Sequence, residues 1–285
     1  MSGTVYLVGA GPGAADLLTL RAARLLERAE IVFHDALVSR EILELCAGAI
    51  RVEVGKRSGR LSTAQHFINK RLADAARMHE VVVRLKGGDP MLFGRAHEEI
   101  SFLARNGIRV EVVPGVTAAL AAAAELNVSL TRRGLSRAIA FLTTRAAPGE
   151  PPNAWLQAAL ATDTVAIYMG AGEAESIRRD LLAAGKPAAT PVAVIENASL
   201  PGSACHAGTL DRLPQLAAHG SGGPLLILMG EVFADAAIIR AWQSAQSSFS
   251  PTAPATRTGR GRSTASRWSS PSASRASAWR SPSSS

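Results

Sequence analysis

Two glycine-rich turns carry most of the residues in this sequence that could hold a ligand. The first, residues 9–14, follows an apolar run and has the G-x-G-x-x-A spacing of a dinucleotide-binding turn. Such a turn presents backbone N–H groups, and a helix that starts behind it favours an anionic ligand. Asp35 lies 22 residues after Gly13, where a ribose-binding acid would complete the pattern. These residues alone favour an NAD-dependent oxidoreductase.

Two details of the first turn weaken that interpretation. Pro12 lies inside the turn and has no N–H to offer a pyrophosphate group. Gly13 follows it immediately, so the loop is G-A-G-P-G and departs from the plain pattern. A single match to this spacing has low specificity, and the ligand of the first turn therefore stays open at this point.

The second glycine turn, residues 87–90, also follows an apolar run. Two such turns then lie at the carboxyl edge of one parallel sheet, where open α/β sheets bind ligands. Gly87 and Gly88 let a ligand approach the backbone closely, and Asp89 adds a carboxylate.

Arg95 and Glu98 follow the second turn and are three residues apart at the start of a predicted helix. At this spacing the two side chains share one face of the helix. A surface salt bridge is the structural alternative, but the place of the pair beside two glycine turns favours a functional role.

Strands that alternate with helices must position both turns. Apolar runs at residues 4–10, 30–35, 50–55, 80–90 and 108–115 predict five strands. Helix-like stretches lie between them at residues 16–29, 39–47, 62–78 and 94–107, with Ser39 as an N-cap and Gly107 as a C′ residue. This alternation predicts a parallel sheet covered by helices on both faces.

The second half of the chain is also predicted to be α/β. Strands are expected at residues 137–144, 163–170, 190–199 and 224–230, and residues 198–216 predict a hairpin-like excursion that makes this sheet mixed. We therefore expect an N-terminal α/β domain at residues 1–114 and a C-terminal one at 115–245. Residues 246–285 are rich in Ser, Pro and Arg and are predicted to be a disordered tail.

Charge and composition argue against several classes of protein. The net charge is +8, but residues 250–285 hold six arginines and no acid, so the rest carries only +2 and a nucleic-acid partner is not expected. A non-catalytic protein that binds nucleic acid through the tail stays as an alternative. No long apolar run predicts a membrane span or a signal peptide, and two distant cysteines favour a reduced, cytoplasmic setting. Six scattered histidines predict no metal site.

Several segments together resemble the tetrapyrrole methylase family. They are VGAGPG, VFHDALVS, VEVGKRSG, VVRLKGGDPMLFGR, EVVPGVTAA, LTRRG and AIYMG, and they cover about residues 3–232. The resemblance implies a homodimer of two-domain chains with the active site in the cleft between the domains. It implies S-adenosylmethionine, bound in a folded form as co-substrate, and no metal. The implied reaction is C-methylation of uroporphyrinogen III at C2 and C7 to give precorrin-2; a later precorrin methyltransferase is the alternative.

The resemblance also implies roles for individual residues. Asp35 and Lys56 are the candidate proton acceptor and donor, while Arg95 and Glu98 flank the substrate. The substrate carries about eight carboxylates, which arginine side chains recognise well. The candidates for this are Arg132, Arg133 and Arg145, although the first two could lie in a solvated turn. The implied cofactor contacts are Pro12, Gly87, Gly88, Asp89, Leu92, Thr117, Ala118, Met169 and Ala198.

Overall fold

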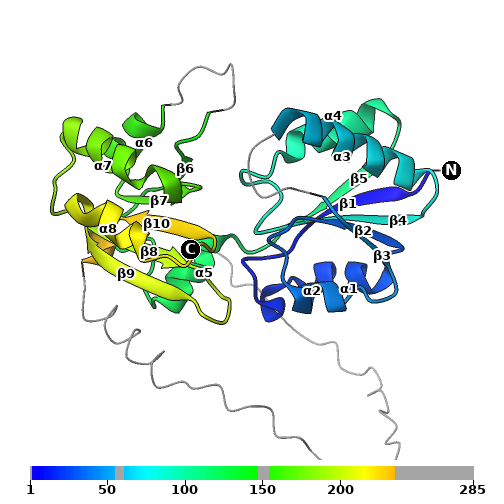
Figure 1. The fold of residues 1–285 in the computed structure, drawn as a ribbon, viewed down its shortest axis with the longest axis horizontal. Coiled ribbons are helices and arrows are strands. Elements are labelled where there is room, and N and C mark those ends of the chain that lie inside the picture. The colour runs from blue at the N-terminus through cyan, green and yellow to red at the C-terminus, as the bar shows by residue number, and fades with distance from the viewer. Residues whose placement is uncertain (1, 55–60, 147–153, 235–285) are drawn as a thin grey trace, which may run out of the picture. The chain divides into compact units, whose positions relative to one another are not determined.

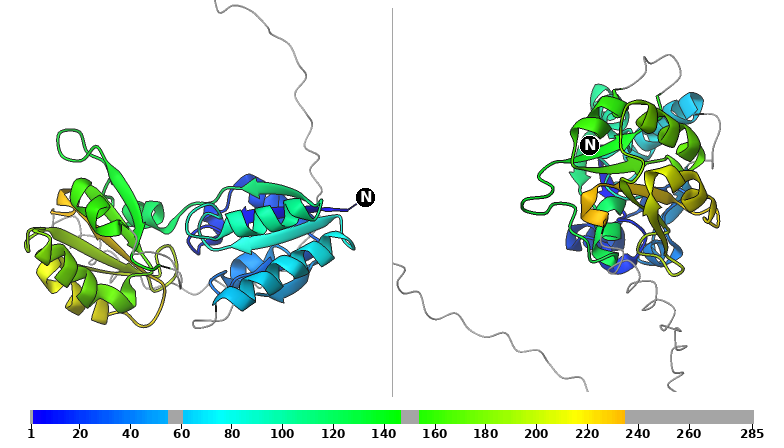
Figure 2. Two further views of the ribbon diagram at one scale, coloured as in Figure 1. Left: turned by 90° about the horizontal axis from the view of Figure 1, so that it is seen from above. Right: turned by 90° about the vertical axis from the view of Figure 1, so that its left-hand side faces the viewer.

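The computed structural model describes residues 2–54, 61–146 and 154–234, and it contains two five-stranded sheets (Figure 1). Figure 2 shows helices packed around each sheet from two further directions. All nine predicted strands are present, and the predicted excursion supplies the tenth. The expected pair of α/β sheets, one parallel and one mixed, is confirmed.

The first sheet is entirely parallel, as predicted. Its strand order is β3-β2-β4-β1-β5, so the strands that lead into the two glycine turns, β1 and β4, are neighbours at its centre. The strands are β1 (Thr4–Gly9), β2 (Ile31–His34), β3 (Ile50–Glu53), β4 (Val81–Lys86) and β5 (Arg109–Val113).

Two pairs of helices cover this sheet on opposite faces (Figure 1). Helices α1 (Leu20–Arg28) and α2 (Arg40–Glu44) pack on one face, and α3 (Leu61–Ala76) and α4 (Ala96–Arg105) on the other. Successive strand residues point to opposite faces, so Leu7 belongs to the α3–α4 core and Val8 to the α1–α2 core. Both faces are therefore buried, which explains the nearly continuous apolar runs in the sequence.

Helix ends test the local predictions. Gly107 adopts the left-handed conformation (φ +68°) after α4, and Ile108 N–H donates to Leu103 O at 3.0 Å, which confirms the predicted C′ glycine. Ser39 is the N-cap residue of α2 as predicted, although its hydroxyl makes no capping hydrogen bond.

The start of α1 differs from the prediction. The helix was expected from residue 16, but a short 3-10 turn, η1 (Ala15–Leu17), comes first and α1 begins at Leu20. Thr19 is extended (φ −69°, ψ 148°), and its Oγ1 accepts a hydrogen bond from Ala22 N–H at 3.1 Å. This N-cap sets the start of the helix.

The second sheet has the order β6-β7-β10-β8-β9. Strands β6 and β7 are parallel, and the other neighbouring pairs are antiparallel. The hairpin of β8 and β9 is the predicted excursion. The strands are β6 (Ile139–Thr143), β7 (Thr164–Tyr168), β8 (Pro191–Glu196), β9 (Ala204–Thr209) and β10 (Leu225–Met229).

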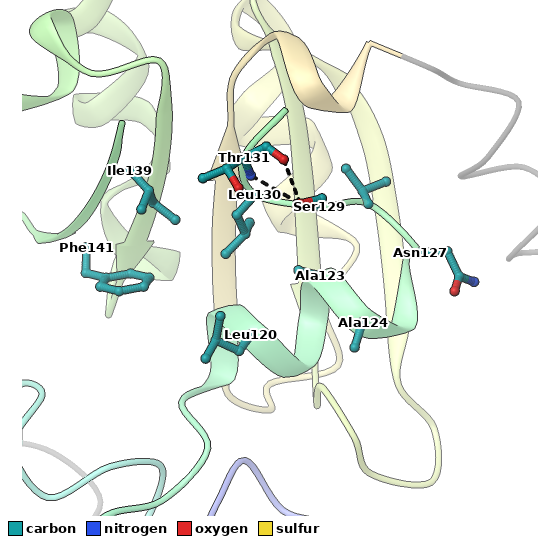
Figure 3. Close-up of a pocket in the computed structure, with 10 residues that line it drawn as sticks. Leu120, Ala123, Ala124, Asn127, Ser129, Leu130, Thr131, Ile139 and Phe141 are labelled. Atoms are coloured by element: carbon teal, nitrogen blue, oxygen red, sulfur yellow. Dashed lines mark hydrogen bonds between the residues drawn. The ribbon is translucent and has the colours of Figure 1, made fainter. Parts of the chain in front are cut away.

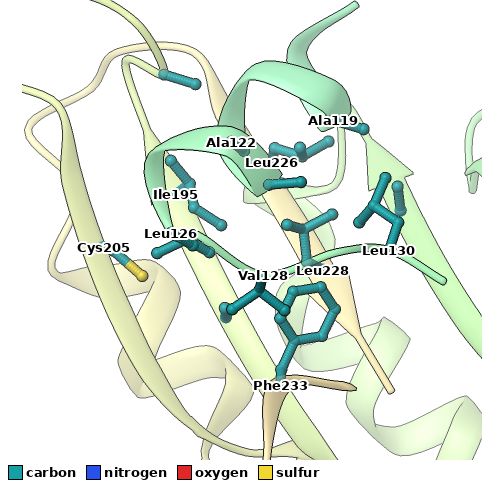
Figure 4. Close-up of a cluster of buried hydrophobic side chains, with 14 of the residues drawn as sticks. Ala119, Ala122, Leu126, Val128, Leu130, Ile195, Cys205, Leu226, Leu228 and Phe233 are labelled. Carbon is teal, nitrogen blue, oxygen red and sulfur yellow. The ribbon is translucent and has the colours of Figure 1, made fainter. Parts of the chain in front are cut away.

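Helix α5 (Ala118–Glu125) covers one face of this sheet, and Figure 4 shows the core beneath it. Ala119 and Ala122 pack there against Leu226 and Leu228 of β10, and the small alanine side chains bring the helix backbone close to the sheet. The other face carries α6 (Trp155–Ala161), α7 (Ala174–Ala183) and α8 (Leu213–Ala218). Short 3-10 turns are η2 (Ala171–Glu173), η3 (Leu210–Arg212) and η4 (Glu231–Phe233).

Some predictions fall outside the described residues. The tail at 246–285 and the end of the predicted C-terminal domain, residues 235–245, are among them, and so is Lys56. The predicted boundary between residues 114 and 115 falls between the last strand of the first sheet and the first strand of the second. Across residues 2–54, 61–146 and 154–234, no helix combines the length and apolar character that a membrane crossing requires.

Candidate active site at the carboxyl ends of the strands

The residues predicted to contact the cofactor follow the carboxyl ends of strands in both sheets. In the first sheet these strands are β4, β1 and β5, which are parallel neighbours. In the second sheet β7 and β8 are both antiparallel to β10, so their carboxyl ends point in the same direction. Pro12 follows β1; Gly87, Gly88, Asp89 and Leu92 follow β4; Thr117 and Ala118 follow β5; Met169 follows β7; and Ala198 follows β8.

The two glycine turns are hydrogen-bonded to one another. Gly11 N–H donates to Gly88 O at 3.1 Å, and Gly88 N–H donates back to Gly11 O at 2.7 Å. Gly88 has a φ of +68°, and a Cβ atom built on it would meet no atom within 4 Å. The backbone of the second turn therefore borders open space, which fits a ligand that is held by close backbone contacts.

Glycines also let the ends of β1 and β5 meet the second turn. A Cβ atom on Gly9 would lie 2.6 Å from Gly115 Cα and 2.8 Å from Gly88 O. Asp89 Oδ2 accepts a hydrogen bond from Gly115 N–H at 2.9 Å, and Oδ1 accepts one from Met91 N–H at 2.8 Å. Both carboxylate oxygens of Asp89 thus fix the turn to its surroundings, and its predicted contact with the cofactor stays a prediction.

The geometry of the first turn argues against a dinucleotide. Helix α1 begins at Leu20, seven positions after Gly13, and only the short 3-10 turn η1 comes between them, so no α-helix N-terminus faces a phosphate at this turn. Asp35, the candidate ribose ligand of that interpretation, instead accepts a hydrogen bond from Arg84 Nη2 at 2.5 Å.

Residues in strained backbone conformations mark the same loops. Among the described residues, non-glycine residues with positive φ are concentrated after β4, β7 and β8. Such conformations cost about 1–3 kcal/mol each and are found where the surroundings hold a functional loop in place. They are Phe93 (φ +52°), Arg95 (+53°), Met169 (+60°), Asn197 (+54°) and Ser199 (+68°), with Asn127 (+52°) as the exception at the end of α5.

Arg95 and Glu98 pair as predicted, although Arg95 is the left-handed N-cap residue of α4 and only Glu98 lies within the helix. Arg95 Nε donates to Glu98 Oε1 at 2.6 Å and Nη2 donates to Oε2 at 2.7 Å, which makes the pair bidentate. The hydrogen bonds from Arg95 lower the pKa of Glu98. Both side chains are partly exposed, so the guanidinium can also meet an anionic group of a ligand.

Sequence reasoning missed a group of buried charges beneath this helix. Arg84 and Lys86 of β4 both contact Glu99 of α4, and Arg84 also holds Asp35. Arg84, Lys86 and Glu99 are 3%, 5% and 0% exposed at their side chains. Burial, together with the charge of Arg84, lowers the pKa of Lys86. Charged residues inside the apolar run VVVRLK were the available signal, because a central strand must bury them.

Tyr168 is a second residue that the sequence did not indicate. Its hydroxyl is 2.6 Å from Thr117 Oγ1 and accepts a hydrogen bond from Ala119 N–H at 3.2 Å, so it caps the start of α5. Burial raises the pKa of Tyr168, which keeps the phenol neutral and able to donate to Thr117. Its ring centroid lies 5.2 Å from that of Phe93 in the strained loop.

The loop after β8 is fixed by Glu125 at the end of α5. Glu125 Oε1 accepts from Ser199 N–H at 2.6 Å, and Oε2 accepts from Ser203 Oγ at 2.8 Å. Ser199 Oγ in turn accepts from Ala14 N–H at 3.1 Å, which joins this loop to the first turn. Ala198 is 8% exposed and belongs to the core cluster beneath α5, so its methyl group is accommodated there.

The three candidate carboxylate-binding arginines lie in the second half of the chain. Arg132 and Arg133 lie in an exposed turn in which Arg132 and Ser136 exchange backbone hydrogen bonds, as the solvated-turn alternative predicts. Arg145 follows β6, and its Nε lies 3.6 Å from Glu173 Oε1. Their contact with a substrate stays a prediction.

An apolar pocket of about 580 Å³ lies beside α5 (Figure 3). Leu120, Ala123 and Ala124 of α5 face Ile139 and Phe141 of the edge strand β6 across it. In the described part of the chain, no group of three or more metal-ligating side chains comes together.

Comparisons with known proteins identify the family. Residues 4–214 match the model of the tetrapyrrole (corrin/porphyrin) methylases. The uroporphyrinogen-III C-methyltransferase of Pseudomonas aeruginosa is 44% identical over 236 residues, which cover 82% of this chain and 96% of that protein. A siroheme synthase of Psychrobacter sp. is 44% identical over 232 residues, or 81% of this chain, but the match spans only 48% of that longer protein.

A solved structure agrees with the sequence relatives. Uroporphyrin-III C-methyltransferase from Thermus thermophilus, complexed with S-adenosylhomocysteine, is 40% identical and superposes with a TM-score of 0.71. The superposition covers 81% of this chain and 98% of that one. Sequence and fold therefore agree that this chain belongs to the tetrapyrrole methylase family.

Proposed function

We propose that this chain transfers methyl groups from S-adenosylmethionine to C2 and C7 of uroporphyrinogen III and so forms precorrin-2. The observation that carries the proposal is the 44% identity to a uroporphyrinogen-III C-methyltransferase over nearly the whole length of that protein. The siroheme synthases are about twice as long as the matched region, so the proposal covers methyl transfer alone.

Backbone groups are proposed to hold the co-substrate in a cleft between the two domains. The open space at Gly88 and the strained loops after β7 and β8 suit a ligand of compact, folded shape. When bound, S-adenosylmethionine supplies an electrophilic methyl group. The main task of the chain is then to hold the pyrrole carbon in line with that group in a site from which water is excluded.

Side chains are proposed to manage the charge and the proton of the substrate. Methylation of a ring carbon is followed by loss of a proton from the ring system, and Asp35 at the end of β2 is the proposed acceptor. Its carboxylate is partly exposed and is oriented by Arg84. Lys56 is the proposed proton donor and lies outside the described residues. Arg95 is too basic to serve as a free base, and we assign it to positioning a carboxylate of the substrate.

The decisive experiment is anaerobic incubation of the purified chain with uroporphyrinogen III and S-adenosylmethionine. Mass spectrometry should show a product that has gained two methyl groups. A parallel incubation with precorrin-2 tests the alternative, a later precorrin methyltransferase. Turnover of precorrin-2 without turnover of uroporphyrinogen III would overturn the proposed substrate but leave the methyl-transfer chemistry intact.

We also propose that the chain works as a cytoplasmic homodimer. The family resemblance supports this assembly, and the apolar pocket beside the exposed side chain of Leu120 offers a candidate surface for it. Analytical ultracentrifugation should give the mass of a dimer. A Leu120→Glu variant places a charge on this surface and should shift the equilibrium toward monomer. If the variant stays a dimer, the dimer contact lies on another surface of the chain.

A further inference from the structure

A largely buried cluster of charges joins the proposed proton acceptor to helix α4, whose N-cap residue is Arg95. We call Asp35, Arg84, Lys86 and Glu99 the Glu99 cluster. Asp35 directly follows strand β2, Arg84 and Lys86 lie on the same face of β4, and Glu99 lies in the first turns of α4. The cluster holds two cations and two carboxylates, so its formal charges balance.

Arg84 is fixed at three separate nitrogen atoms. Nη2 donates to Asp35 Oδ1 at 2.5 Å, Nε donates to Glu99 Oε1 at 3.2 Å, and Nη1 donates to Leu85 O at 3.1 Å. These three acceptors determine the plane of the guanidinium group. A lysine at this position has a single nitrogen atom and could not reach all three with the same geometry.

The Glu99 carboxylate accepts hydrogen bonds from three side chains, those of Arg84, Lys86 and Gln65. Lys86 Nζ donates to both carboxylate oxygens at 3.1 and 3.2 Å, and Gln65 Nε2 donates to Oε1 at 3.1 Å. Lys86 also lies close to the strained loop, because a Cβ atom built on Gly94 would be 3.0 Å from Lys86 Cε. One buried carboxylate therefore holds Arg84, which contacts Asp35, and Lys86, which lies beside Gly94.

Asp35 differs from the other members of the cluster in its exposure. Its side chain is 30% exposed, whereas Arg84, Lys86 and Glu99 are almost fully buried. Its Oδ1 is bonded to Arg84, while Oδ2 accepts no hydrogen bond from any residue that the structure describes. One oxygen is therefore anchored and the other can face a ligand, which is the arrangement a proton acceptor requires.

We propose that Arg84 is a positioning residue for the methyl-transfer reaction, acting through Asp35, and that Glu99 sets the orientation of Arg84. The inference rests on the proposed function, in which Asp35 accepts the proton. Arg84 itself is 3% exposed and lies behind Asp35, so its effect on the reaction passes through that carboxylate.

The test compares Arg84→Lys with the wild-type protein under anaerobic steady-state conditions. We expect kcat to fall roughly ten- to a hundredfold, as a displaced catalytic group commonly produces. The KM for S-adenosylmethionine and the calorimetric Kd for S-adenosylhomocysteine should stay within about twofold. Arg109→Lys, at an exposed position of β5 in the same sheet, is the matched control and should leave kcat unchanged.

A second variant covers the case in which Arg84→Lys does not fold. Glu99→Asp keeps the charge but shortens the side chain by one methylene group, so it should displace Arg84 and give the same loss of kcat at unchanged cofactor affinity. A kcat within twofold of wild type in either folded variant overturns the inference. So does a loss of S-adenosylhomocysteine affinity that matches the loss of kcat. Failure of the wild-type chain to methylate uroporphyrinogen III would instead overturn the proposed function.

Discussion

Replacing Glu99 by glutamine should lower the free energy of unfolding more than the same replacement at the neighbouring Glu98. Glu99 is fully buried and accepts charge-assisted hydrogen bonds from Arg84 and Lys86 at 3.1–3.2 Å. Glutamine keeps the shape but removes the charge, and it leaves two buried cations with Asp35 as their remaining partner. Breaking a buried ion pair from one side costs about 3–5 kcal/mol, and we expect a loss of this size.

The assay is urea unfolding followed by circular dichroism, with Glu98→Gln as the matched control. Glu98 is the preceding residue of the same helix and pairs with Arg95 at a half-exposed site, where a salt bridge contributes only about 0–1 kcal/mol. A loss below about 1 kcal/mol for Glu99→Gln, equal to that of Glu98→Gln, would refute the electrostatic account of the cluster.

The pH dependence of the Glu99→Gln variant gives an independent check. Burial lowers the pKa of Lys86, and removal of the Glu99 charge takes away a partner that raises it. A lysine whose folded pKa lies below its unfolded value of about 10.4 binds fewer protons when folded, so the free energy of unfolding rises with pH up to that value. The deficit of Glu99→Gln relative to wild type should therefore shrink as the pH rises from 7 toward 10. A constant deficit would contradict this reasoning.

Three further predictions address the loops and the thiol. Arg95→Ala should lower kcat/KM for the tetrapyrrole roughly a hundredfold while S-adenosylhomocysteine binds as before in calorimetry; a collapse of cofactor affinity would show that Arg95 holds the cofactor. Gly9→Ala places a Cβ atom 2.6 Å from neighbouring backbone, so it should lower the free energy of unfolding by about 1–3 kcal/mol and weaken S-adenosylhomocysteine binding. Gly48→Ala is the control: its Cβ atom would meet no atom within 4 Å, so neither stability nor binding should change. Burial, with a contribution from the charge of Glu125, raises the pKa of the Cys205 thiol to about 12. Iodoacetamide at pH 8 should therefore label Cys205 only after denaturation, and rapid labelling of the folded protein would contradict this prediction.

The strands could be predicted because each is a short apolar run between helix-like stretches. The order β3-β2-β4-β1-β5 could not, because pairing depends on contacts between residues far apart in the sequence. The start of α1 was predicted four residues too early. Residues 15–20 read Ala-Asp-Leu-Leu-Thr-Leu, and their apolar spacing suits a helix, but the extended backbone at Thr19 delays the helix to Leu20.

The candidate site was predicted in part, and the omissions have a common cause. Glycines and exposed polar residues in loops are visible as interruptions of the apolar pattern, so Gly88 and Arg95 were found. Arg84 and Tyr168 lie inside strands, and their roles depend on partners 49 residues away at Asp35 and 51 residues away at Thr117. No local pattern reveals such pairs; a charge in a central strand is the only local sign that a partner must exist.

The two sides of the candidate site differ in the part of the chain that forms them. On the proposed cofactor side the close contacts are made by backbone, with Gly9, Gly88 and Gly115 packed against one another. On the proposed substrate side they are made by charged side chains, among them Asp35 and Arg95. Added bulk on the first side should therefore act through backbone displacement and alter cofactor affinity. Altered charge on the second side should act on turnover, so comparing Gly9→Ala with Arg95→Ala separates the two effects.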